Sequence, residues 1–261
     1  MTERLTGKKI LVTRPVEQAG KLCELIEKEG GITIRLPVID IKPLPDEPHL
    51  REILSSVSSY DIGIFISQNA VRWTLELLNK DMHALYNLKI VAIGKATASI
   101  LKQAGITEVE YAETLASSET LLELPVFADQ RLKGAKIIIF RGAGGREFLA
   151  DRLAEKGAFV DYVDVYQRIP CRYDSSILDN IFFYENPDFI VVTSNEGLQN
   201  LFDMLSSKQR DVMLNTQLLV LGKRMADLAL KLGFTKKPVV AEETSDRGLL
   251  KAIMYSVGTP D

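Results

Sequence analysis

An internal repeat is the feature of this sequence that most limits how it can fold. Four blocks of the first half recur in the same order in the second half, with an offset of 127 residues in the first two blocks and 128 in the last two. Such ordered self-similarity predicts two copies of one folding unit. The blocks pair Leu11–Arg14 with Ile138–Arg141, Asp61–Asn69 with Asp188–Glu196, Ile90–Lys95 with Leu218–Lys223, and Ser117–Leu122 with Ser245–Leu250.

Most of the blocks begin with a short apolar run that one or two polar or glycine residues follow. Apolar residues at helical spacing come next, as at Leu22, Leu25 and Ile26. Buried strands that alternate with helices are typical of parallel sheets covered on both faces. We therefore expect an α/β protein with two similar doubly wound parallel-sheet lobes. Glycines at positions 30, 105, 157 and 233 are expected to end helices in the left-handed conformation.

Two extended stretches interrupt the repeated blocks and are interpreted as connectors. Leu36–Pro45 contains three prolines, and Tyr162–Pro170 alternates with a period of two. If the chain leaves the first lobe after about residue 37 and returns near residue 165, that lobe is discontinuous. A tandem arrangement of 1–130 and 131–261 is the alternative, and the residue pattern alone leaves both open.

Composition narrows the functional classes. With 46% hydrophobic and 26% charged residues, the chain is typical of a soluble globular protein. Its apolar runs are far shorter than the roughly 20 residues of a membrane span, and no signal peptide is recognisable, so we expect a cytoplasmic protein without membrane contact. A net charge of −3 argues against nucleic-acid binding. Cys23 and Cys171 are expected to be free thiols, and no spacing suggests a metal site.

The candidate ligand site lies in the loops that follow the predicted strands. Ligands of open parallel sheets bind at this carboxyl edge, where helix N-termini attract anions. Cations gather in these loops although the whole chain is acidic, which favours a carboxylate or phosphate ligand. The cations are Arg14, Lys95, Arg141, Arg146, Lys223 and Arg224, and the polar candidates are Ser67, Thr97 and Ser194.

The glycine-rich loop Gly142–Glu147 does not fit a dinucleotide motif. Glu147 occupies the place of the third glycine, where its carboxylate would repel a pyrophosphate. The sequence has no Walker motif and no histidine-based catalytic triad. Nucleotide chemistry and catalysis by histidine are therefore not expected.

The chain resembles the uroporphyrinogen-III synthase family in motifs that span almost its whole length. They are Val12-Thr13-Arg14-Pro15, Phe65-Ile66-Ser67-x-Asn69-Ala70-Val71, Ala92-Ile93-Gly94-x-x-Thr97-Ala98, Arg141-Gly142-x-x-Gly145-Arg146-Glu147-x-Leu149, Val165-Tyr166-x-Arg168 and Thr193-Ser194. The resemblance implies two lobes joined by a two-stranded β connector, with the first lobe discontinuous. It assigns residues 1–37 and 170–261 to lobe A, 38–49 and 160–169 to the connector, and 50–159 to lobe B.

The resemblance also implies a reaction. Enzymes of this family cyclise the linear tetrapyrrole hydroxymethylbilane to uroporphyrinogen III with inversion of ring D, without a cofactor, in a cleft between the lobes. Loss of a hydroxyl gives an azafulvene cation, and attack by the substituted carbon of ring D gives a spiro intermediate that opens and closes again the other way round. The unaided substrate closes to the uninverted isomer, so the protein must mainly hold one geometry.

Individual residues take roles from this resemblance. Tyr166 matches the tyrosine thought to help the hydroxyl leave, and Ser67, Thr97 and Ser194 match polar positions that line the cleft. Together with the cations of the strand-end loops they are the predicted substrate-binding residues, and those cations are Arg14, Arg141, Arg146, Lys223 and Arg224. Arg224-Met225 stands where the family often has two threonines, so a charged contact is expected there in place of a hydroxyl.

The resemblance also gives expectations about partners. We expect a monomer that makes a transient contact with the enzyme that supplies hydroxymethylbilane. The alternative function is a non-catalytic two-lobed binding protein for an anionic small molecule, which would sequester this substrate and not convert it.

Overall fold

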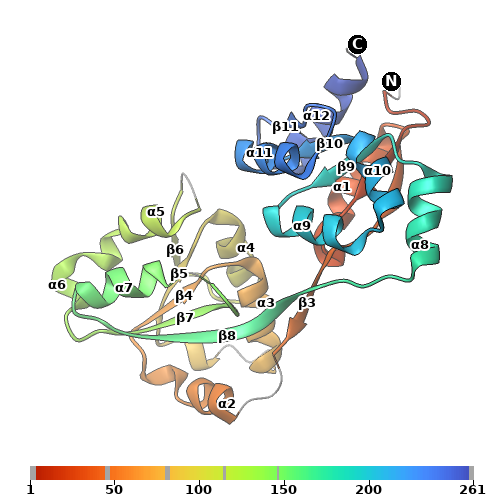
Figure 1. Cartoon of the computed structure of the whole chain (residues 1–261). Helices are drawn as coiled ribbons and strands as arrows, with labels where there is room; N and C mark the ends of the chain where they lie inside the picture. Colours follow the sequence, from red (N-terminus) through yellow and green to blue (C-terminus); the bar gives the residue numbers. More distant parts are fainter. Residues whose placement is uncertain (1–3, 45–47, 80–82, 114–115, 146, 259–261) are drawn as a thin grey trace. The chain divides into compact units, whose positions relative to one another are not determined.

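The chain divides into two compact units that are described separately. The structure is a computed structural model, and it describes residues 4–44, 48–79, 83–113, 116–145 and 147–258. Unit 1 comprises Met1–Asp40 and Ile169–Asp261, and unit 2 comprises Ile41–Arg168. Figure 1 shows the N-terminal and C-terminal segments, red and blue, sharing unit 1, with the yellow and green segments in unit 2.

Unit 1 is built on a five-stranded sheet in which every neighbouring pair is parallel. Its three inner strands are apolar and mostly buried, as the predicted continuous apolar runs require, whereas the residues of the two edge strands are half-buried or exposed. In spatial order they are β11 (Val239–Val240), β10 (Gln217–Val220), β9 (Phe189–Val192), β1 (Lys9–Val12) and β2 (Ile32–Arg35).

Helices α1 and α12 of unit 1 contact each other and share one core cluster with the sheet. Leu22 and Ile26 of α1 pack there with Leu249 and Ile253 of α12. Helices α9 and α11 contact each other separately. The helices of this unit are α1 (Val16–Lys28), α8 (Ser175–Asp179), α9 (Asn195–Met204), α10 (Ser207–Asn215), α11 (Lys223–Leu232) and α12 (Asp246–Gly258), and a π-helical segment covers Asn180–Glu185.

Unit 2 is built on a six-stranded sheet. Its strands in spatial order are β3 (Ile39–Pro43), β8 (Phe159–Pro170), β7 (Lys136–Gly142), β4 (Ile62–Phe65), β5 (Lys89–Ala92) and β6 (Val109–Tyr111). The pairs from β8 to β6 are parallel. The helices are α2 (Pro48–Ser55), α3 (Gln68–Leu77), α4 (Lys95–Gln103), α5 (Ser118–Leu122), α6 (Asp129–Leu132) and α7 (Phe148–Glu155), with short 3₁₀ turns at Val57–Ser59, His83–Leu85 and Pro125–Phe127.

Two separate cores cover the two faces of this sheet. Ile138 and Phe140 of β7 point into the cluster beneath α2, α3 and α4, where the Phe140 ring stacks on Phe65 with centroids 4.4 Å apart. Ile137 and Ile139 point the other way, into the cluster beneath α5, α6 and α7. Helices on both faces of a parallel sheet confirm the predicted fold class.

The repeated blocks occupy matching places in the two sheets. The order β11-β10-β9-β1-β2 in unit 1 corresponds strand for strand to β6-β5-β4-β7-β8 in unit 2. The four glycines that were predicted to end helices all have positive φ, at 81° for Gly30, 98° for Gly105, 91° for Gly157 and 101° for Gly233. Glycine is needed there because side chains are disfavoured in this region.

The predicted connector of residues 38–49 and 160–169 falls on strands β3 and β8, and it stays a prediction. Strand β8 pairs with β7 over most of its length, and β3 is the neighbour of β8 at the edge of the six-stranded sheet. Most of the second predicted segment therefore belongs to the sheet of unit 2. The physical reason is that Val160, Tyr162, Val163 and Val165 bury apolar surface against the two cores. Residues 45–47 lie outside the described part.

Candidate functional site

Tyr166 and Ser67, the predicted catalytic residue and a predicted binding residue, lie in hydrogen-bond contact in unit 2. Tyr166 Oη lies 3.2 Å from Ser67 Oγ. Ser67 is the N-cap of α3, where its Oγ also accepts a hydrogen bond from the Ala70 backbone N–H at 3.0 Å. Tyr166 is 1% exposed, whereas Ser67 is only partly buried. Ser67 is therefore the member of the pair that a ligand can reach.

A β-bulge in β8 decides which face Tyr166 occupies. The register of β7 and β8 shifts after Arg141, so that Gly142 pairs with Tyr166 and Val165 becomes an extra residue. Side chains alternate between the faces of a strand, so one extra residue sends the following side chains to the other face. Tyr166 consequently joins Val165 in the core beneath α3 and α4, whereas Tyr162 packs on the opposite face.

Gly142 leaves the space that the Tyr166 ring occupies. A Cβ at position 142 would lie 2.5 Å from Cζ of Tyr166 and 2.9 Å from its Oη, far inside van der Waals contact. Only a residue without a side chain lets the phenol lie across the end of β7. The bulge and this glycine together hold the hydroxyl beside Ser67.

Thr97 lies at the next turn along the same edge of the sheet. It is the third residue of α4, which follows β5, the parallel neighbour of β4. The residue is buried, with 3% of its surface exposed. Lys95, the first residue of α4, is exposed. The turns after β4 and β5 thus place Ser67 and Lys95 at an accessible carboxyl edge of unit 2, whereas Thr97 is buried there.

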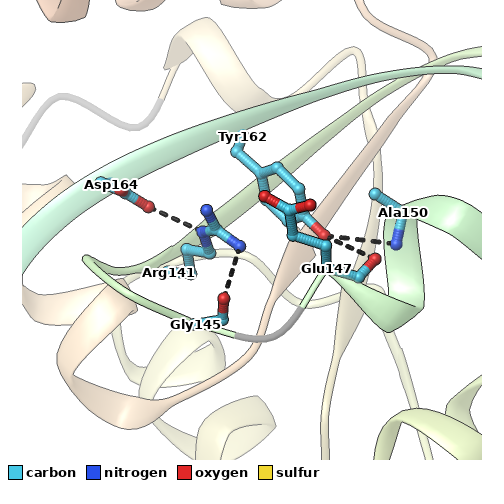
Figure 2. Close-up of polar contacts among 6 residues, drawn as sticks. All are labelled: Arg141, Gly145, Glu147, Ala150, Tyr162 and Asp164. Carbon is cyan, nitrogen blue, oxygen red and sulfur yellow. Dashed lines mark hydrogen bonds and ion pairs between the residues drawn. The ribbon is translucent and has the colours of Figure 1, made fainter.

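Arg141 packs on Tyr162, on the opposite face of the sheet from Tyr166. Figure 2 shows the neighbours that hold it. Its Nε donates to Asp164 Oδ1 at 2.7 Å, and its Nη1 donates to the Gly145 carbonyl at 3.2 Å. The guanidinium carbon lies 3.5 Å from the centroid of the Tyr162 ring, within the range of a cation–π contact. The residue is 8% exposed. These contacts give Arg141 a structural role, and its predicted substrate contact stays a prediction.

Tyr162 extends this cluster to the start of α7, as Figure 2 also shows. Its hydroxyl donates to the Glu147 carbonyl at 3.0 Å and accepts from the Ala150 N–H at 3.3 Å. Burial raises the pKa of the Tyr162 hydroxyl, which keeps the donated proton in place. The glycine-rich loop is therefore fastened to β8 at both ends. Arg146, a predicted binding residue in that loop, lies outside the described residues.

In unit 1, the predicted binding residue Arg14 follows β1 and forms an ion pair with Asp246, the first residue of α12. Both side chains are largely buried, with 13% and 20% exposed. A carboxylate in the first turn of a helix also benefits from the helix dipole. Asp246 is thus the carboxylate partner of Arg14, where a substrate carboxylate was expected.

The remaining predicted residues of unit 1 lie at the N-termini of two helices. Ser194 is the N-cap of α9 and accepts from the Gly197 N–H at 2.9 Å. Lys223 and Arg224 are exposed in the first turn of α11, after the N-cap Gly222. Cations are disfavoured by about 0.3–1 kcal/mol at a helix N-terminus, so their placement supports binding of an anion there.

The described part of the chain shows neither a cluster of metal-binding side chains nor a helix able to span a membrane. It contains no group of three or more His, Cys, Asp or Glu side chains that could hold a metal ion. It also contains no helix with the length and hydropathy of a membrane span. Cys23 is buried and Cys171 is partly buried, and within the described residues neither forms a disulfide.

Comparisons with known proteins place these features in a family. Residues 20–251 match the family described as uroporphyrinogen-III synthase HemD. The uroporphyrinogen-III synthase of Escherichia coli (strain K12) is 31% identical over 94% of this chain and 99% of its own. The chain belongs to the uroporphyrinogen-III synthase family. The family resemblance predicted from the sequence is thereby confirmed.

Solved structures support the fold. The uroporphyrinogen-III synthetase of Helicobacter pylori 26695 has a TM-score of 0.63 at 14% identity, covering 95% of this chain and 99% of its own. A mutant uroporphyrinogen III synthase of Thermus thermophilus has a TM-score of 0.61 at 20% identity, covering 96% and 99%. Members of the uroporphyrinogen-III synthase family are cyclising lyases of tetrapyrrole biosynthesis, so the predicted function and enzyme class are confirmed at this level.

Three contributors to the site were not assigned a role from the sequence. Gly142 was noted in the glycine-rich loop and in a family motif, Arg168 in a family motif, and Asp246 as part of the repeat. No signal in the sequence marked the bulge at Val165, because Tyr162-Val163 in the same stretch is an equally consecutive pair and pairs regularly with β7. The roles of Thr97, Ser194, Lys223 and Arg224 in binding stay predictions.

Proposed function

We propose that Ser67 and Tyr166 form a proton relay that releases the hydroxyl of hydroxymethylbilane, in a cofactor-free cyclisation to uroporphyrinogen III. The observation that carries this proposal is the 3.2 Å contact between Tyr166 Oη and the Oγ of Ser67 at the carboxyl edge of unit 2. Tyr166 is too buried to touch a substrate, and Ser67 is accessible. The serine therefore contacts the substrate and the phenol supplies the proton.

The relay conserves atoms and charge. The Ser67 proton passes to the departing hydroxyl, the Tyr166 proton replaces it on Oγ, and the C–O bond breaks to release water. An azafulvene cation and a phenolate result. The substituted carbon of ring D attacks the cation, the spiro intermediate opens and closes at the other carbon, and the proton lost from carbon on closure restores the phenol.

The test uses freshly prepared hydroxymethylbilane and sub-stoichiometric protein without added metal or cofactor. The wild-type protein should yield mainly the type III isomer, whereas a protein that only binds the substrate would leave the type I isomer of unaided closure. Tyr166→Phe should lower kcat by roughly 10²- to 10⁴-fold, as is typical of general acids.

Ser67→Gly separates a relay from a purely structural cap. Glycine preserves most of the N-cap energy, losing only a few tenths of a kcal/mol, but removes the hydroxyl. A relay predicts that Ser67→Gly lowers kcat about as much as Tyr166→Phe, and that the double variant is no worse than either. Ser206→Gly, at the N-cap of α10, is the matched control and should retain activity. Normal turnover in Tyr166→Phe would refute the relay.

The oligomeric state, the cellular location and the partner of the protein stay predictions. The monomeric state, the cytoplasmic location and the transient contact with the enzyme that makes hydroxymethylbilane are expectations from the sequence. Substrate carboxylates are proposed to meet the cations at the carboxyl edges, of which Lys223 and Arg224 are exposed.

A further inference from the structure

Arg168 contacts the same Tyr166 hydroxyl as Ser67 does. It lies two residues after Tyr166 on β8, beyond the bulge, so the two side chains share a face of the strand. Its Nη2 donates a hydrogen bond to Tyr166 Oη at 3.3 Å, and its guanidinium carbon lies 5.8 Å from the ring centroid. Arg168 is exposed, while the phenol it contacts is buried.

The chemistry of these groups gives the hydrogen-bond chain a direction. A guanidinium can only donate, so Tyr166 Oη accepts from Arg168, and the phenol proton is left to bond Ser67. Ser67 Oγ accepts this proton together with the N–H of Ala70. Both acceptor positions of Ser67 are then filled, and its own proton points outward. Without Arg168, either hydroxyl could be the donor of the Ser67–Tyr166 bond.

We propose that Arg168 is a positioning residue that orients the relay from Tyr166 through Ser67 and stabilises the phenolate that forms during hydroxyl release. The inference rests on the proposed function, because it acts on the same two side chains. A positive charge that is already in place beside a developing anion favours the transition state more than the ground state. Arg168 therefore acts on turnover and not on substrate affinity.

The experiment measures kcat and KM for type III product with Arg168→Gln, Arg168→Lys and their combinations with Tyr166→Phe. Arg168→Gln should lower kcat about 10- to 100-fold with KM nearly unchanged, because a charged donor is lost from a charge-assisted bond. Arg168→Lys should recover part of the loss. In the Tyr166→Phe background, Arg168→Gln should have no further effect, because no phenolate can form.

Arg131→Gln is the matched control, since Arg131 is an exposed arginine of unit 2 on α6. It should leave both constants unchanged. A raised KM with normal kcat in Arg168→Gln would overturn the inference and assign Arg168 to substrate carboxylate binding. An equal loss of kcat with and without the Tyr166 hydroxyl would also overturn it. If Tyr166→Phe has a lowered kcat and Arg168→Gln has a normal kcat, the inference about Arg168 fails and the relay stands. Normal turnover in Tyr166→Phe would refute the relay, and the inference about Arg168 would fail with it.

Discussion

Replacing Gly142 by alanine tests whether the position of the Tyr166 ring is set by the missing side chain. The new Cβ would lie 2.5 Å from Tyr166 Cζ, so the ring must retreat by about 1 Å to reach an ordinary carbon–carbon contact. The ring is 1% exposed and packs in the core beneath α3 and α4. Overpacking of this kind costs about 1–3 kcal/mol. The same shift would stretch the 3.2 Å contact with Ser67 beyond hydrogen-bonding distance.

The chain carries its own reporter for this measurement. Trp73 is the single tryptophan, and it packs against the core cluster that contains Tyr166. Urea unfolding followed by Trp73 fluorescence therefore reports on unit 2, and we expect Gly142→Ala to lower its stability by about 1–3 kcal/mol. Turnover should fall toward that of Tyr166→Phe.

A double-mutant cycle isolates the contact. Tyr166→Leu removes the part of the ring that a Cβ at position 142 would strike, so Gly142→Ala should cost markedly less in that background. Equal destabilisation by Gly142→Ala with either residue at position 166 would refute the reasoning.

Three further predictions concern unit 2. Thr74 Oγ1 is the buried side-chain polar atom without a partner in the described residues, so Thr74→Val should raise stability by about 1 kcal/mol in urea unfolding, and a loss would contradict it. Arg141→Met removes the ion-pair partner of Asp164 and should lower stability by roughly 2 kcal/mol, with KM unchanged in the folded enzyme. A raised KM would instead support the predicted contact of Arg141 with the substrate. Burial and the hydrogen bond to Asp161 raise the pKa of Tyr60 from 10.0 to about 12. The stabilisation from Tyr60 is therefore complete below pH 10 and is lost as the pH rises toward 12. Tyr60→Phe should flatten this loss of stability with pH in Trp73-monitored unfolding, and an unchanged dependence of stability on pH would refute the assignment.

Part of the site followed from local sequence. The turn after each apolar run marks the carboxyl edge of a parallel sheet, and this placed Ser67, Thr97 and Ser194 at or near helix N-termini, as the structure has them. The orientation of Tyr166 did not follow. A strict period of two would have set Tyr166 on the face of Tyr162, and one extra residue in β8 reversed it. A bulge depends on the pairing of two strands, which a single stretch of sequence does not contain.

The pairing of the strands is what the tertiary structure alone decided. The repeat by itself determined that two similar units exist, with β1, β2 and β4 to β6 from the first copy and β7 to β11 from the second. Each unit combines strands of both copies, because β1 pairs with β9 and β4 pairs with β7. These strands are all buried and apolar, so no local pattern distinguishes β9 from β4 as a partner of β1. The choice of strand partner rests on contacts between segments that are distant in the sequence. Leu22 of α1 and Leu249 of α12, for example, pack in one core cluster, and such contacts exist only in the folded chain.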